Sequence, residues 1–174
     1  RFLGNLDADL RREILYCPMP LDFGHSEKER IHSRFPDVRV DASVPAPKRF
    51  SSTRIIVIDH CATTLLESLA ANLPTILYWD PERWEMRDEA EEMFGNLREC
   101  GVLFDTPESA AAQLSAVYAD PARWWDETSL QAVRREFIHR YALNSPSWPR
   151  QWATTMLSEL NVRGAATEAR RAAL

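Results

Sequence analysis

The clearest hydrophobic pattern lies near the middle of the chain. Arg54–Ile58 is a nearly continuous run of Ile and Val, which is typical of a parallel strand covered on both faces. We expect a helix to follow, because Thr63 or Thr64 can cap its start and Pro74 can end it. The apolar run Thr75–Trp79 then predicts a second strand. The segment therefore predicts a βαβ unit with a right-handed crossover.

Apolar and polar positions elsewhere predict more strands and helices. The expected strands are Glu13–Cys17, Val38–Val40 and Val102–Phe104. The expected helices are Leu3–Arg12, Ser26–Arg34, Arg87–Cys100, Pro107–Tyr118, Asp120–Tyr141 and Pro146–Leu160. Ser26 and Glu29 fit a capping box, and Gly101 fits the position just after a helix. This order predicts an α/β fold, a Rossmann-like parallel sheet with flanking helices.

Length, charge and cysteines narrow the class of protein. The 174 residues suffice for one well-buried domain. We expect it over residues 1–160, with a frayed tail over 161–174, where no apolar stripe continues. The net charge of −5, with scattered Lys and Arg, argues against a nucleic-acid partner. Three cysteines without metal-type spacing favour a reduced, cytoplasmic setting. The first residue is Arg1 rather than Met, so we expect the chain to be a fragment of a longer protein.

Candidate chemistry gathers on three loops. The carboxyl ends of the parallel strands, where α/β sheets bind ligands, are expected to lead into Pro18–His25, Asp59–Thr64 and Asp80–Glu85. The second loop opens a helix whose first backbone amides suit a phosphate or carboxylate. Thr63, Thr64 and His60 are candidates to hold that group. The alternative is that the threonines only cap the helix and His60 lies on the surface.

Further candidates flank this helix start. Glu67 lies on the same helical face as the threonines and could accept hydrogen bonds from a ribose diol, or could be an exposed helix acid. Gly24 permits a positive φ or a close backbone approach, and His25 beside it could move a proton or be structural. Arg83 or Arg87 could meet an anion.

The aromatic residues at the third loop leave two interpretations open. Trp79 and Trp84 could stack on a base or sugar, or could pack in the core.

Several site classes are missing from the sequence. The five glycines form neither G-x-x-x-x-G-K nor G-x-G-x-x-G, so P-loop and dinucleotide sites are excluded. H-E-x-x-H, C-x-x-C and G-x-S-x-G are also absent. We therefore expect no metal and no cofactor.

The motifs also resemble a known family. The pattern T-T-x-L-E-x-L-x-x-N-x-P-T-I is met from Thr63 to Ile76. Before it come Asp22-Phe23-Gly24 and Lys28-Glu29-Arg30, which match a D-Y/F-G segment followed by a K-E-R helix. Over Asp22–Trp152 the chain resembles transferases encoded in bacterial surface-carbohydrate clusters. Asp59-His60-Cys61 departs from that family's pattern, which has a Tyr-Asn-like pair there.

That family is similar in turn to the C-terminal, donor-binding half of GT-B glycosyltransferases, including Kdo transferases and polyol-phosphate polymerases. The resemblance implies a metal-independent glycosyltransferase that binds a nucleotide-sugar donor through Thr63 and Thr64 at the phosphate and Glu67 at the ribose. It also implies a glycan or glycolipid acceptor, a separate N-terminal domain, and a cytoplasmic location that can include the inner face of the membrane. The catalytic base is expected from the N-terminal domain, with His25 as the candidate in this chain.

Other functions are compatible with the same residues. A GT-B-like sugar-nucleotide epimerase, a polyol-phosphate transferase and a non-catalytic binding or assembly module are the alternatives.

Overall fold

The computed structural model describes residues 1–18, 24–142 and 145–172. The chain divides into two compact units, Arg1–Ala142 and Leu143–Leu174. Asp22 and Phe23, with most of the first predicted loop, lie outside the described residues. The division into a domain over residues 1–160 and a tail remains a prediction.

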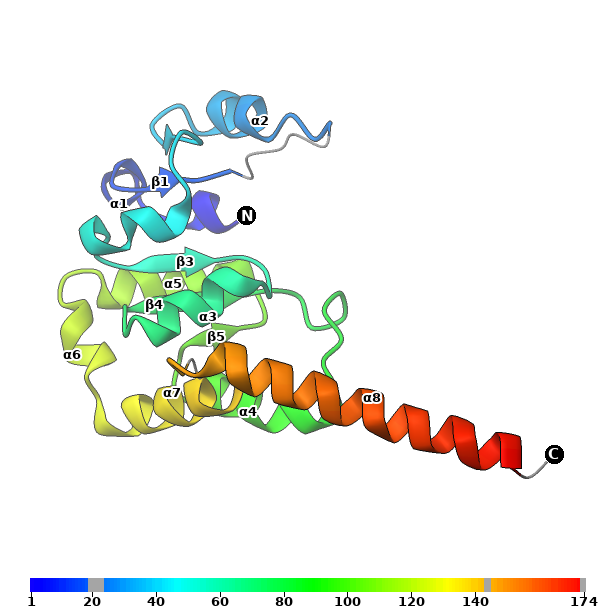
Figure 1. The fold of residues 1–174 in the computed structure, drawn as a ribbon. Helices are drawn as coiled ribbons and strands as arrows, with labels where there is room; N and C mark the ends of the chain where they lie inside the picture. Colours follow the sequence, from blue (N-terminus) through cyan, green and yellow to red (C-terminus); the bar gives the residue numbers. More distant parts are fainter. Residues whose placement is uncertain (19–23, 143–144, 173–174) are drawn as a thin grey trace. The chain divides into compact units, whose positions relative to one another are not determined.

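The strands of the first unit form two small parallel sheets (Figure 1). One has the order β3-β4-β5, with β3 (Ile56–Ile58), β4 (Thr75–Tyr78) and β5 (Leu103–Phe104). The other pairs β1 (Leu15–Tyr16) with β2 (Arg39–Val40). The predicted α/β class, with parallel strands flanked by helices, is confirmed.

The prediction that β1 shares a single sheet with β3 and β4 is wrong. β1 has only two paired residues, and Pro18, which has no N–H to donate to a ladder, follows two residues after its end. In the structure β1 therefore pairs with β2 alone and lies outside the β3-β4-β5 sheet.

The helices of the first unit follow the predicted order, except that η2 was not predicted. They are η1 (Phe2–Asn5), α1 (Ala8–Arg12), α2 (Glu27–Arg34), η2 (Ala46–Ser52), α3 (Thr63–Ala70), α4 (Asp88–Glu99), α5 (Pro107–Val117), α6 (Pro121–Trp125) and α7 (Thr128–Tyr141). The second unit contains α8 (Trp148–Ala172).

Two predicted helices are each divided in the structure. The helix predicted over Leu3–Arg12 becomes η1 and α1, because the Asp7 side chain accepts a hydrogen bond from the Leu10 amide at 2.8 Å and caps a new helix. The helix predicted over Asp120–Tyr141 becomes α6 and α7, because Glu127 has an extended backbone with φ −56° and ψ 131°.

The last helix is longer than predicted. α8 continues to Ala172, whereas the predicted helix ends at Leu160. The prediction stopped where the apolar stripe ends. The Ala, Arg and Glu residues that follow favour a helix through their intrinsic propensity alone.

The β3-β4-β5 sheet is covered on both faces. Residues alternate along each strand, so Ile58 and Leu77 belong to one apolar cluster, and Val57 and Ile76 to another. The first cluster is completed by α3, α4 and α7, and the second by η1 and α5. The second cluster also includes Val38 and the partly buried Tyr16, which belong to the β1–β2 region. The two small sheets therefore share one core.

Candidate functional site

The carboxyl ends of the strands gather at one edge. β3 and β4 are adjacent and parallel, so the segments after Ile58 and after Tyr78 leave the sheet at the same edge. Burial raises the pKa of Tyr78, and the charge of Asp59 raises it further. Burial also raises the pKa of Tyr16, as do its hydrogen bond to Glu27 and the charge of Asp59. The ends of β1 and β4 therefore lie within electrostatic reach of one carboxylate.

Helix α3 begins at this edge without a side-chain cap. Its N-cap residue is Ala62, with φ −142° and ψ −177°, and Thr63 and Thr64 are the first two helical residues. The prediction that one of the threonines caps the helix is wrong, because the extended backbone ends one residue earlier than expected. The first-turn amides of α3 thus have no capping side chain.

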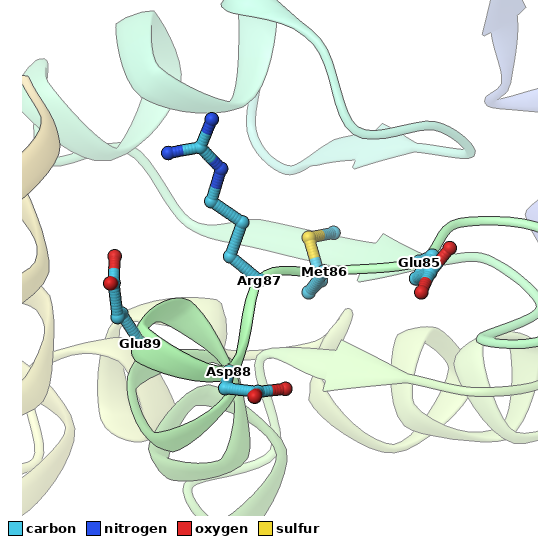
Figure 2. A pocket seen from close by; sticks show the side chains of 5 residues that line it. All are labelled: Glu85, Met86, Arg87, Asp88 and Glu89. Carbon is cyan, nitrogen blue, oxygen red and sulfur yellow. The ribbon is translucent and has the colours of Figure 1, made fainter.

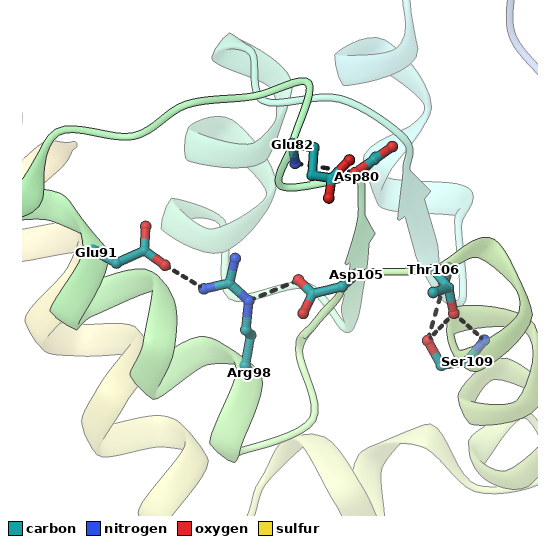
Figure 3. A network of polar contacts seen from close by, with 7 residues as sticks. All are labelled: Asp80, Glu82, Glu91, Arg98, Asp105, Thr106 and Ser109. Carbon is teal, nitrogen blue, oxygen red and sulfur yellow. Dashed lines mark hydrogen bonds and ion pairs between the residues drawn. The ribbon is translucent and has the colours of Figure 1, made fainter.

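The neighbouring helix starts are less suited to an anion. Thr106 caps α5 by accepting the Ser109 amide at 3.2 Å, as Figure 3 shows. α4 has no side-chain cap, but Asp88, Glu89 and Glu91 occupy its first turn. α3 has no acid in its first turn. Three helices follow β3, β4 and β5. Among these three, only α3 has both a start without a side-chain cap and a first turn without an acidic residue, so the positive end of its dipole is free to attract an anion.

Glu67 lies one helical turn beyond the threonines. It is exposed on α3, three residues after Thr64 and four after Thr63, so the three side chains share a helix face. The structure therefore places Glu67 one helical turn from both threonines on α3.

His60 and Asp59 lie between β3 and α3. The His60 Nδ1 atom is 2.9 Å from the Asp59 Oδ1 atom, and the two side chains are 44% and 56% exposed. His60 is thus paired with a carboxylate on its own loop and also accessible from solvent.

Arg83 is held by its own loop. Its Nε atom is 3.3 Å from Asp80 Oδ2, and its side chain is 82% exposed. Asp80 also accepts the Glu82 amide through Oδ1 at 3.0 Å, which closes a tight turn. An ion pair this exposed contributes little to stability, so Arg83 can exchange Asp80 for another anion.

Arg87 lines an open hollow of about 500 Å³ with Glu85, Met86, Asp88 and Glu89. Figure 2 shows its side chain extending away from α4. Three of the five lining residues are acidic, so the hollow itself does not favour a phosphate.

The two tryptophans at the third loop differ. Trp79 is only 3% exposed and packs edge-on against Phe94, with ring centroids 5.9 Å apart. Of its two interpretations, core packing is the correct one. Trp84 is 41% exposed.

The segment that enters α2 has an unusual backbone. Gly24 has φ +84°, so its predicted positive φ is confirmed, and His25 beside it is exposed. Ser26 is the N-cap residue of α2, yet it has φ +46° and its side chain makes no capping hydrogen bond. The predicted capping box with Glu29 is therefore wrong, because a capping side chain requires an extended N-cap backbone.

Sequence reasoning missed the contacts that hold α3 in place. Asn72 has φ +54° and follows the helix, and Leu73 N bonds Ser68 O at 3.1 Å, which closes a Schellman motif. The Trp125 indole N–H donates to Asn72 Oδ1 at 3.0 Å and to its carbonyl oxygen at 3.2 Å. Arg134 donates to Leu69 O at 2.8 Å. Asn72, two residues before the helix-ending Pro74, was the one local signal.

The sequence also showed no sign of a polar bridge between α4 and the end of β5. Arg98 on α4 bonds Asp105, which follows β5, at 2.8 Å, and Glu91 at 3.0 Å (Figure 3). The bridge ties α4 to the end of β5. Gly101, predicted to follow this helix, has φ +71°, and its prediction is confirmed.

Replacing Asn72 is expected to loosen α3. Asn72→Ala puts an alanine in a left-handed conformation, which its Cβ disfavours, and removes one acceptor of the Trp125 N–H. We therefore expect the free energy of unfolding to fall by about 1–3 kcal/mol. Asn72→Gly removes the same acceptor but tolerates the backbone, so its loss should be smaller. Urea unfolding of both variants measures this. Equal losses would contradict the backbone part of this explanation.

Some features that would add other chemistry are not found in the described ranges. No three His, Cys, Asp or Glu side chains among these residues are grouped as a metal ion would require. Within the same ranges, no helix combines the length and apolar character needed to cross a bilayer.

Parallel strands flanked by helices place the protein in the Rossmann-like α/β class. Residues 1–156 match the model of the LIC12162 family transferases, and the chain belongs to this family. No curated protein and no solved structure gave a match. The expectation of a transferase family is thus confirmed, whereas the narrower similarity to GT-B and Kdo transferases remains a prediction.

Proposed function

We propose that this chain is the donor-binding part of a glycosyltransferase that moves a sugar from a nucleotide-sugar donor to a surface-polysaccharide acceptor. The observation that carries the proposal is the start of α3, which has neither a side-chain cap nor a first-turn acid. Membership of a transferase family agrees with it.

In this proposal the donor phosphate lies at the start of α3. The backbone amides of Thr63 and Thr64 donate to it, and their hydroxyls add two further hydrogen bonds. Negative charge grows on the phosphate as the glycosidic bond breaks, so fixed donors and the helix dipole stabilise the transition state more than the ground state. This strategy needs no metal ion.

Other residues are assigned around that phosphate. Glu67 would accept hydrogen bonds from the ribose hydroxyls, one helical turn away. Arg83 would exchange Asp80 for the donor, and Gly24 would allow a close backbone approach. The glycan or glycolipid acceptor, the N-terminal partner domain and a place at the cytoplasmic face of a membrane remain predictions from the resemblance.

Ligand screening on the full chain tests this function. The panel would contain CMP, UDP, GDP and dTDP sugars, with CDP-polyols as the rival donors. A ligand that binds only the folded state raises the melting temperature by mass action. Stabilisation by a nucleotide sugar supports the proposal, stabilisation by CDP-polyols alone favours a polyol-phosphate transferase, and no stabilisation contradicts both.

Glu67 gives a sharper test of the ribose contact. Glu67→Gln should weaken a bound ribonucleotide about tenfold, because a neutral amide is a weaker acceptor than a carboxylate. The loss should be smaller for the 2′-deoxy analogue, which lacks one of the two hydroxyls. Isothermal titration calorimetry measures both.

Glu136→Gln, at an exposed position of α7, is the matched control and should alter neither affinity. Equal losses for the two nucleotides would make Glu67 a surface acid of the helix.

A further inference from the structure

We infer that His60 is the general base that accepts the proton of the acceptor hydroxyl, with Asp59 as its positioning residue. This inference rests on the proposed function and deepens it, because it places the base in this chain.

The pair has the geometry of a base and its orienting carboxylate. The 2.9 Å separation of Asp59 Oδ1 and His60 Nδ1 is a hydrogen-bond distance. A carboxylate can only accept a hydrogen bond, so Nδ1 carries the proton. In neutral imidazole, Nε2 then has a lone pair that can accept another proton. The histidine side chain is 44% exposed, which leaves it accessible to an acceptor.

The position of the pair fits the reaction. His60 is two residues before Ala62, the N-cap residue of α3, and two residues after Ile58, where β3 ends at the carboxyl edge of the sheet. A donor phosphate at the first turn of α3 would put the reacting sugar near the same loop. The charge of Asp59 also acts on Tyr16 and Tyr78, at the ends of β1 and β4. The carboxylate is thus at the edge where the strand ends meet.

The proton and charge balance is simple. The acceptor oxygen forms a bond to the anomeric carbon while its proton moves to His60 Nε2. The bond from the anomeric carbon to the phosphate oxygen breaks, and its electron pair stays on the phosphate at α3. The imidazolium then returns its proton to water, which restores the enzyme.

The test separates catalysis from binding. Affinity is measured by calorimetry, and turnover is measured as hydrolysis of the bound nucleotide sugar, with water as acceptor, on the full chain. His60→Gln should keep the affinity within about twofold and lower turnover about 100-fold or more, as loss of a general base does. His139→Gln, at an exposed position of α7, is the matched control and should change neither quantity.

Asp59 needs a measurement that a merely structural role would not affect. Asp59→Asn should lower turnover about tenfold or more and also shift the ring-nitrogen resonances of His60, because Nδ1 no longer donates to a carboxylate. Nitrogen-15 NMR of the free protein detects that change without any ligand. Unchanged resonances would refute the role of Asp59.

The remaining outcomes each decide the inference. Loss of affinity in His60→Gln at normal turnover would make His60 a phosphate donor. Unchanged turnover, or loss of turnover in His25→Gln instead, would place the base elsewhere, as would donor binding by the unmodified chain without any hydrolysis. Failure of every nucleotide sugar to bind would refute the proposed function, and this inference with it.

Discussion

Thr64→Glu is expected to weaken nucleotide-sugar binding more than about 100-fold while leaving the chain about as stable as before. Thr64 is the second residue of α3, whose first turn has no acid. A carboxylate there interacts favourably with the helix dipole, by about 0.3–1 kcal/mol. The same carboxylate would occupy the position proposed for the donor phosphate and repel it. Calorimetry measures the affinity, and thermal unfolding measures the stability.

A large loss of affinity at unchanged stability cannot be caused by damage to the fold. Thr63→Val combined with Thr64→Val is the graded control, since it removes the hydroxyls but keeps the backbone amides. It should weaken binding about tenfold. Full affinity in Thr64→Glu would show that the donor phosphate does not bind at α3.

Phe137→Ala is expected to cost about 3–5 kcal/mol of the free energy of unfolding. The side chain is 1% exposed and packs against Phe94 and Tyr141, with ring centroids 5.3 and 4.9 Å apart. Truncation removes these contacts and leaves a cavity that fixed neighbours on α4 and α7 cannot fill. Denaturant unfolding measures the loss.

Phe50→Ala, at a half-buried position of η2, serves as the comparison. It should lower the free energy of unfolding clearly less than Phe137→Ala does. A cost below about 1 kcal/mol for Phe137→Ala would contradict the packing described for this core.

The central βαβ unit could be predicted because its signals are local. The run Ile55–Ile58 predicts a strand covered on both faces, and Pro74 ends the helix that follows it. Gly101 supplies the left-handed residue that ends α4. Each of these depends on a few neighbouring residues. Helix starts were less predictable, since Ser26 has the right residue type for a cap but a left-handed backbone.

The candidate site was predicted in part. Thr63, Thr64 and Glu67 follow from the helix pattern, since residues three and four apart share a face. The sequence did not show that α3 begins without a side-chain cap, because this depends on the backbone angles of Ala62. Trp79 was ambiguous because an aromatic residue at a strand end suits a ligand or a core equally.

By itself the sequence determined the α/β class, the order of strands and helices, and the loops that follow the strands, because all of these arise from short-range pattern and stereochemistry. The tertiary structure decided how the strands divide into two sheets and what holds α3 in place. The Trp125–Asn72 bond joins residues 53 positions apart, and the Arg98 bridge joins a helix to the end of a strand. Such contacts form only when distant segments pack together. Side-chain geometry then selects among the available partners, and the local sequence pattern does not encode that geometry.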